Sequence, residues 1–160
     1  MQGRRAVVTL ARAIGSTRRC PKVLLKARHP SSTLARPVKP KKILVVDDSD
    51  LMHRMYGVML RGGELLGARD GEEALATLAA DPAIDLVLLD INMPKMNGFE
   101  VLRELGVRGL LPALRVIVVT TEGRDADAQR GLAAGAAAYL TKPFRAEEVR
   151  AAIAALAEPA

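Results

Sequence analysis

Acidic side chains follow two predicted strands, at the point where each strand ends. Asp47 and Asp48 come directly after the apolar run KKILVV, and Asp90 comes directly after LVLL. A lysine, Lys142, follows a later apolar run in YLTKPF. Carboxylates that are brought together repel one another, and a hard divalent cation with oxygen ligands relieves that repulsion. Three carboxylates and one lysine therefore indicate a site for Mg²⁺ or Mn²⁺ and a phosphoryl group.

Each of these residues also has a purely structural interpretation. Adjacent acids after a strand can cap the next helix, which would explain Asp47 and Asp48 taken alone. A threonine at a strand end, such as Thr120, is common because β-branched residues favour strands. Helix capping does not explain why Asp90 and Lys142 lie at corresponding strand ends, so the site hypothesis accounts for more of the pattern.

The elements that must position these residues alternate from residue 41 onward. Short apolar runs predict strands over 43–46, 64–66, 84–89, 115–119 and 137–141. Helical spacing, caps and stop signals predict a helix from Ser49 to Leu60 and others over 74–80, 98–105, 125–133 and 145–157. Parallel strands need a crossover, usually a helix, so we predict an α/β fold with a doubly wound five-stranded parallel sheet and helices on both faces. Ligands of such sheets gather at the carboxyl ends of the strands. The polar residues named above lie at these ends: Asp47, Asp48, Asp90, Thr120 and Lys142.

Charge divides the chain into two parts. Residues 1–42 hold 12 of the 24 Lys and Arg and no acid, so the remainder holds 12 basic and 18 acidic residues, a net charge of −6. The one cysteine, Cys20, cannot form an internal disulfide, and no apolar run approaches the roughly 20 residues of a membrane span. We expect a cytoplasmic protein with one domain over 41–160.

The basic, proline-containing extension over 1–40 is predicted to be disordered, and four interpretations stay open for it. It can reflect a mis-assigned start, with translation beginning near Val38. It can be a tail that binds nucleic acid or acidic surfaces by charge. It can also be an inert tail or a transit-type peptide.

Four motifs resemble, in order, the receiver domain of bacterial two-component response regulators, the CheY-like superfamily. They are VVDDS, LLDINMPKMNGFE, VVTTEG and AAYLTKPF. The resemblance covers about residues 41–158 and implies a flavodoxin-like sheet with strand order 2-1-3-4-5. It also implies a cis peptide bond between Lys142 and Pro143.

The resemblance assigns roles to matching positions. Asp90 is the phosphoacceptor, and Lys142 and Thr120 contact the phosphoryl group. Ligands of Mg²⁺ or Mn²⁺ are implied at Asp47, Asp48, Asp90 and the backbone carbonyl of Asn92. Thr120 and Tyr139 form the switch pair, and Asn92 and Glu122 tune the rate of phosphoryl loss, here toward a short-lived aspartyl phosphate.

The function expected from this resemblance is a single-domain response regulator that catalyses only its own phosphorylation and dephosphorylation. A histidine kinase or histidine phosphotransfer protein would donate near the first helix, around Met52, His53 and Tyr56. A downstream protein would bind the face of the fourth helix, fifth strand and fifth helix, around Gln129, Tyr139, Lys142 and Arg145. Two alternatives stay open: a phosphorylation-independent interaction module, and a nucleic-acid or scaffold protein that acts through its basic tail.

Overall fold

The computed structural model describes residues 23–25, 40–111, 113–121 and 124–157, and every structural statement below refers to them. Five parallel strands form most of one sheet: β2 (Lys42–Val46), β3 (Glu64–Ala68), β4 (Leu86–Leu89), β5 (Arg115–Thr120) and β6 (Ala138–Thr141). The helices are α1 (Asp50–Met59), α2 (Gly71–Ala80), α3 (Gly98–Val107), α4 (Asp125–Ala133) and α5 (Ala146–Ala157). The sheet order β3-β2-β4-β5-β6 confirms the predicted doubly wound topology, 2-1-3-4-5 when only the parallel strands are numbered.

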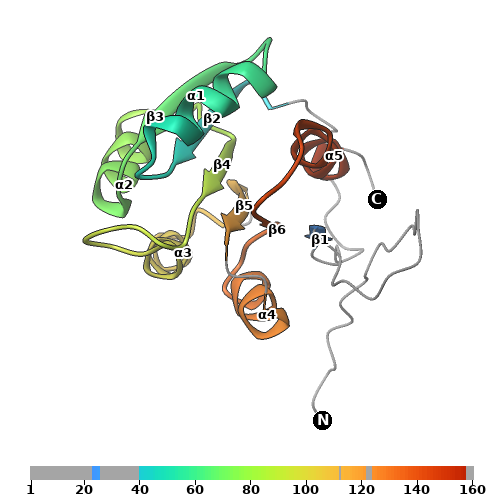
Figure 1. Cartoon of the computed structure of the whole chain (residues 1–160). Helices are drawn as coiled ribbons and strands as arrows, with labels where there is room; N and C mark the ends of the chain where they lie inside the picture. Colours follow the sequence, from blue (N-terminus) through green and yellow to red (C-terminus); the bar gives the residue numbers. More distant parts are fainter. Residues whose placement is uncertain (1–22, 26–39, 112, 122–123, 158–160) are drawn as a thin grey trace.

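A sixth strand was not predicted. β1 (Val23–Leu25) lies in the basic extension and pairs antiparallel with β6, on the side of β6 that faces away from β5 (Figure 1). Its three apolar residues are too few to give a periodic pattern, and they stand between prolines and basic residues. Strand pairing with a distant element therefore decided this structure, and local sequence preference did not.

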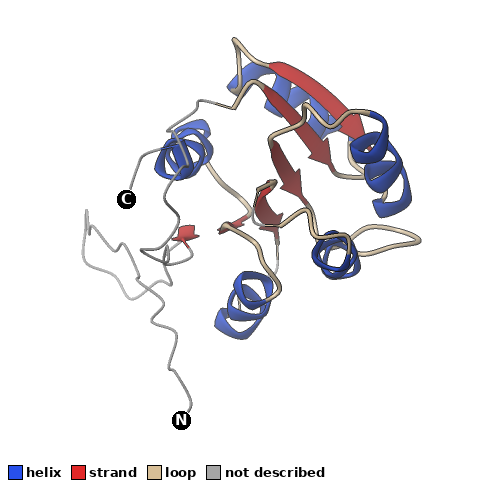
Figure 2. Cartoon of the chain, turned by 180° about the vertical axis from the view of Figure 1, so that it is seen from behind, coloured by secondary structure: helices blue, strands red, loops and turns tan. Residues whose placement is uncertain are grey.

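The sheet is covered on both faces, as Figures 1 and 2 show. Alternate strand residues face opposite layers. Leu44 and Val46 pack on the side of α2, α3 and α4, whereas Ile43 and Val45 pack on the side of α1 and α5. This arrangement explains why the strands read as continuous apolar runs.

The connections after the strands are fixed by helix caps. Ser49 accepts a hydrogen bond from the backbone N–H of Met52 at the start of α1, and Asp70 accepts one from Glu73 at the start of α2. Asn97 and Glu100 form a reciprocal capping box that begins α3. Within the described part of the chain, no helix combines the length and apolar character that a membrane span requires.

Candidate phosphoacceptor site

The acidic residues meet at one edge of the sheet because β4 and β2 are neighbours. The backbone N–H of Asp90 donates to the carbonyl of Val46 (2.9 Å), and that of Asp47 donates to the carbonyl of Ala68 (3.1 Å). One carboxylate oxygen from each of Asp47, Asp48 and Asp90 lies within 4.8 Å of the others. Asp47 and Asp90 are buried and Asp48 is exposed, so the cluster is partly enclosed by the protein and is accessible to solvent at Asp48.

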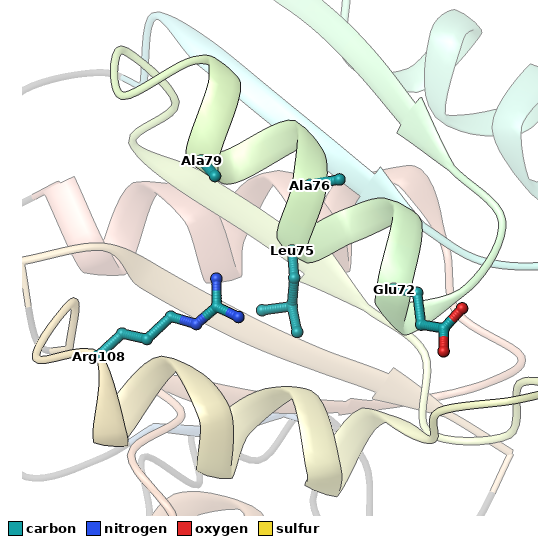
Figure 3. Close-up of a pocket in the computed structure, with 5 residues that line it drawn as sticks. All are labelled: Glu72, Leu75, Ala76, Ala79 and Arg108. Carbon is teal, nitrogen blue, oxygen red and sulfur yellow. The ribbon is translucent and has the colours of Figure 1, made fainter.

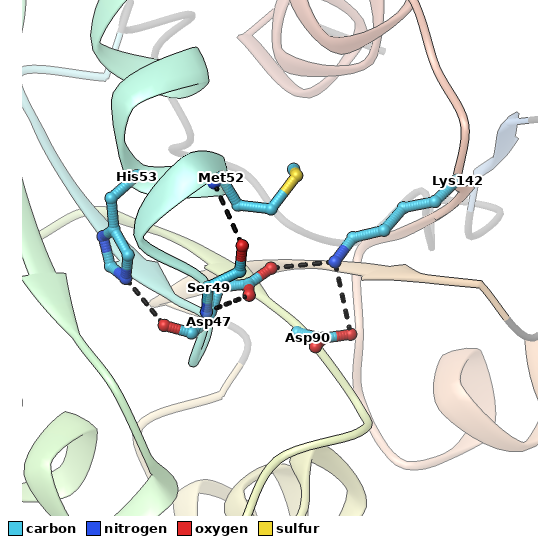
Figure 4. A network of polar contacts seen from close by, with 6 residues as sticks. All are labelled: Asp47, Ser49, Met52, His53, Asp90 and Lys142. Carbon is cyan, nitrogen blue, oxygen red and sulfur yellow. Dashed lines mark hydrogen bonds and ion pairs between the residues drawn. The ribbon is translucent and has the colours of Figure 1, made fainter.

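Lys142 reaches the same cluster from β6. Its Nζ lies 2.8 Å from Oδ2 of Asp47 and 3.7 Å from Oδ1 of Asp90 (Figure 4). The backbone N–H of Lys142 donates to the carbonyl of Thr120 (2.8 Å), which ties the residue to the end of β5. The Lys142–Pro143 peptide bond is cis, as the resemblance implied.

Asp47 is held in place by two further groups. Its Oδ1 accepts a hydrogen bond from the backbone N–H of Ser49 (2.9 Å). Its carbonyl oxygen lies 2.7 Å from Nε2 of His53, an arrangement in which Nε2 donates (Figure 4). This role of His53 was not predicted from the sequence. A signal was present in Gly67, since a glycine inside a strand often marks a close approach, and a Cβ there would lie 2.9 Å from Nδ1 of His53.

The surroundings of Asp90 oppose its ionisation. Burial, with 7% of the residue exposed, raises the pKa of its carboxyl group from 3.8 to about 6. The positive charge of Lys142 lowers this pKa and the charge of Asp47 raises it, while the backbone N–H groups of Asn92 and Ile91 lower it again. One ammonium group therefore only partly compensates three carboxylates.

Three carboxylates beside one ammonium group leave an excess of negative charge at this site, which a divalent metal would balance. The available donors are carboxylate oxygens, two of them buried, and the cluster is exposed at Asp48, where water can complete a coordination shell. Oxygen donors with room for water are the set that Mg²⁺ prefers. The residues present therefore fit Mg²⁺.

The loop that carries Asp90 is packed closely against α3. The backbone N–H of Gly98 donates to the carbonyl of Ile91 (3.0 Å), and a Cβ at Gly98 would lie 2.5 Å from the carbonyl oxygen of Asp90. Farther along the loop, Nζ of Lys95 donates to Oδ2 of Asp70 at the start of α2 (2.7 Å). The loop that follows Asp90 is thus held in place by contacts with two helices.

The remaining predicted residues are distributed as follows. Thr120 is fully buried at the end of β5, and Asn92 is exposed in the loop after Asp90. Tyr139 is buried on β6, where the ring is close enough to α4 that a Cβ at Gly131 would lie 3.3 Å from Cδ2. Glu122 lies outside the described residues.

One expected donor contact is wrong. Met52 and His53 are half-buried on α1, but Tyr56 is 1% exposed and its ring stacks on Phe144, with centroids 5.8 Å apart. Tyr56 faces the sheet because apolar spacing along α1 turns this position toward the core. It cannot contact a docking protein.

A pocket elsewhere on the molecule belongs to a different region. It lies between α2 and α3, has a volume of about 340 Å³, and is lined by Glu72, Leu75, Ala76, Ala79 and Arg108 (Figure 3). None of these residues belongs to the acidic cluster, and most are small or apolar. We assign the pocket no chemistry.

Comparison with known proteins agrees with this geometry. The family model described as response regulator receiver domain matches residues 43–154. The transcriptional regulatory protein CpxR of Klebsiella pneumoniae is 43% identical over 117 residues, which cover 72% of this chain and 48% of CpxR. The alkaline phosphatase synthesis transcriptional regulatory protein PhoP of Bacillus subtilis is 36% identical over 118 residues, covering 72% and 48%. The chain thus spans about half the length of these curated relatives.

Solved structures give the same relationship. The chemotaxis protein CheY4 of Vibrio cholerae is 34% identical with a TM-score of 0.64, and the match covers 70% of this chain and 94% of that one. CheY in the CheX-CheY-BeF3-Mg+2 complex of Borrelia burgdorferi is 29% identical with a TM-score of 0.70, covering 75% and 91%.

Proposed function

The chain belongs to the response regulator receiver domain family, and from this premise we propose that it is a Mg²⁺-dependent phosphoacceptor switch that takes its phosphoryl group on Asp90. The observation that carries the proposal is the position of this carboxylate. Asp90 is buried at the end of β4, 3.7 Å from Nζ of Lys142 and beside the carboxylates of Asp47 and Asp48. Signal transduction by a two-component system is the function of this family.

The proposed transfer is a direct displacement at phosphorus. A carboxylate oxygen of Asp90 forms the new P–O bond while the bond from phosphorus to the donor breaks, and the donor's leaving group departs with the electron pair and takes up a proton. With its pKa at about 6, Asp90 is ionised for the most part at neutral pH and can act as the nucleophile.

The other residues of the site neutralise charge and hold positions. Lys142 already contacts Asp47 and is close enough to Asp90 to turn toward a phosphoryl oxygen bound there. Asp47, Asp48, Asp90 and the carbonyl of Asn92 would hold Mg²⁺. When bound, this ion supplies positive charge to the transferring phosphoryl oxygens. The CheX-CheY-BeF3-Mg+2 complex of Borrelia burgdorferi supports this choice of metal.

Response regulators interact with histidine kinases and downstream partners, and we propose a histidine kinase or histidine phosphotransfer protein as the donor here. An apolar hollow of about 290 Å³ lies beside the site and is lined by Met52, Met55, Thr121, Lys142, Pro143 and Phe144. A donor that seats an apolar side chain in this hollow would approach Asp90 between α1 and the turn that follows β6. This replaces the expectation that Tyr56 is part of the donor surface.

The downstream protein is proposed to bind the face formed by α4, β6 and α5. Gln129 and Arg145 are exposed on this face. Tyr139, which was expected to contact the partner, is 2% exposed and is buried together with Thr120, so it is not part of the contact surface in this conformation. Phosphorylation would draw Thr120 toward the phosphoryl group and shift the balance between two conformations that differ at Tyr139. Asn92 and Glu122 are proposed to make the phosphoryl group short-lived, as in a chemotaxis-type regulator.

The proposal is tested by incubating the full chain with a small acyl phosphate donor and Mg²⁺, and measuring intact mass. We expect the wild type to gain one phosphoryl group, and expect none after chelation of Mg²⁺ or in Asp90→Ala. The matched control is Asp85→Ala, which removes an aspartate five residues earlier and outside the cluster. A folded wild-type protein that gains no phosphoryl group would contradict the proposal.

A further inference from the structure

The outer edge of β6 accepts a strand from the chain's own extension. Val23 is paired with Leu140, Leu24 with Tyr139, and Leu25 with Ala138. Without β1, β6 would be the outermost strand of the described sheet, with a row of unpaired backbone groups. Such an edge binds extended peptides by strand addition, in which backbone hydrogen bonds give affinity and side-chain sites give selectivity.

The side chains of β1 fit both faces of this edge. Leu24 packs into the layer on the side of α4, which contains Tyr139 and Leu132. Val23 and Leu25 point to the other face and pack into the layer of α5, which contains Val149. Three consecutive apolar residues are what a strand needs when helices cover both of its faces. The edge therefore selects an apolar tripeptide in extended conformation.

Charge also favours the chain's own segment as the occupant. Lys22 and Lys26 flank the strand, and residues 1–42 carry 12 basic and no acidic residues, against 12 basic and 18 acidic in the remainder. The helix α5 contacts β1 and contains Glu147 and Glu148 in its first turn. Because residues 26–41 tether the strand to β2, its effective concentration at the edge is on the order of millimolar.

We propose that Val23–Leu25 is an intramolecular occupant of the β6 edge, which covers Tyr139 and must leave before a partner can pair with that edge. The inference rests on the proposed function, because it concerns the α4, β6 and α5 face through which the signal would leave. Its test involves no phosphorylation. Failure of the inference can therefore be distinguished from failure of Asp90 as the acceptor.

The test uses the full chain in three forms: wild type, Leu24→Asp, and the matched control Leu34→Asp, which makes the same change in the extension outside β1. Amide hydrogen exchange is measured residue by residue. A synthetic peptide of residues 21–29 is then added at about 1 mM, the concentration needed to match a tethered segment. Binding is followed through the amide signals of Tyr139 and Leu140.

We expect the β6 amides that face β1 to exchange about tenfold faster or more in Leu24→Asp, with Val45 and Leu88 still protected. The peptide should shift the β6 signals of Leu24→Asp and leave wild type and Leu34→Asp unchanged. If Leu24→Asp also loses protection at Val45, Leu24→Ser takes its place under the same criteria. Equal exchange in all forms, or a peptide that binds wild type as well as Leu24→Asp or binds neither, would overturn the inference.

Discussion

At the scale of single residues, the site depends on a carboxylate whose environment resists its charge. Asp90 is buried, lies beside Asp47, and has one ammonium group, that of Lys142, within 3.7 Å. Burial of this group disfavours its charged form, and a ligand that brings positive charge relieves this cost. Such a ligand is therefore bound more tightly. The pH dependence of stability should show this directly.

The first prediction concerns stability without metal. The pKa of Asp90 is 3.8 in the unfolded chain and about 6 in the folded one. The folding stability that comes from this tighter binding of the proton is therefore fully present below pH 3.8 and is lost as pH rises through 6. The loss is at most about 3 kcal/mol. In urea unfolding with a chelator, Asp90→Asn should be more stable than wild type near neutral pH. That difference should vanish by about pH 4; a constant difference across this range would contradict the assignment.

A second prediction concerns Tyr56. Its hydroxyl is buried and, among the described residues, has no hydrogen-bond partner. Burial, with the charges of Asp47 and Asp90, raises the pKa of this hydroxyl far above its usual range. Tyr56→Phe removes an unsatisfied polar atom and keeps the stack on Phe144, so we expect unchanged or higher stability, by up to about 1 kcal/mol. Tyr56→Ala, the control, should cost about 3 kcal/mol or more in the same urea titration. A large loss in Tyr56→Phe would show that the hydroxyl has a partner.

At the scale of elements, α3 and the loop that follows Asp90 behave as one unit. A Cβ at Gly98 would lie 2.5 Å from the carbonyl oxygen of Asp90 and 2.9 Å from Cα of Ile91, both backbone atoms. Backbone cannot move aside as a flexible side chain can. The loop must shift if this position gains a methyl group.

The third prediction compares two glycines of the same helix. Gly98→Ala should destabilise the protein by about 1–3 kcal/mol and slow phosphorylation of Asp90, because overpacking displaces the loop. Gly106→Ala is the matched control, since nothing lies within 4 Å of its Cβ position. Alanine favours the helix, so this variant should gain up to about 1 kcal/mol. The melting temperature and rate of mass gain check both, and equal behaviour of the two variants would refute the packing argument.

Much of the element order could be predicted from the sequence. Apolar runs such as LVLL, with polar residues directly after them, indicate buried parallel strands and the edge where the site lies. β1 could not be predicted, because three residues carry no periodicity and their strand exists only through pairing with β6. The bond from His53 to the carbonyl of Asp47 depends on how α1 crosses Gly67. That packing is a feature of the tertiary structure, and helical spacing alone does not predict it.

At the scale of the whole molecule, the sheet connects the acidic cluster to the proposed output face. β4 ends directly before Asp90, β5 ends at Thr120, and β6 contains Tyr139 and ends directly before Lys142. A ligand bound at the strand ends therefore acts on three neighbouring strands at once. Its binding free energy should appear in the stability of the entire domain.

The fourth prediction uses that linkage. Mg²⁺ at about ten times its dissociation constant should stabilise the wild type by about 1.4 kcal/mol. Asp48→Asn should lose this gain with little change in metal-free stability, because Asp48 is exposed. The matched control is Asp50→Asn, an exposed acid on the first turn of α1 that is outside the cluster. Urea unfolding with and without Mg²⁺ checks the prediction, which fails if Asp48→Asn keeps the full gain.

The central claim is that the carboxylate of Asp90 accepts the phosphoryl group, and one measurement tests it most directly. The full chain is phosphorylated with an acyl phosphate and Mg²⁺ and reduced with borohydride, which converts an aspartyl phosphate to homoserine, and its peptides are then sequenced by mass spectrometry. We predict homoserine at position 90 alone. Homoserine at Asp47 or Asp48, or none at position 90 in a protein that has gained a phosphoryl group, would contradict the account.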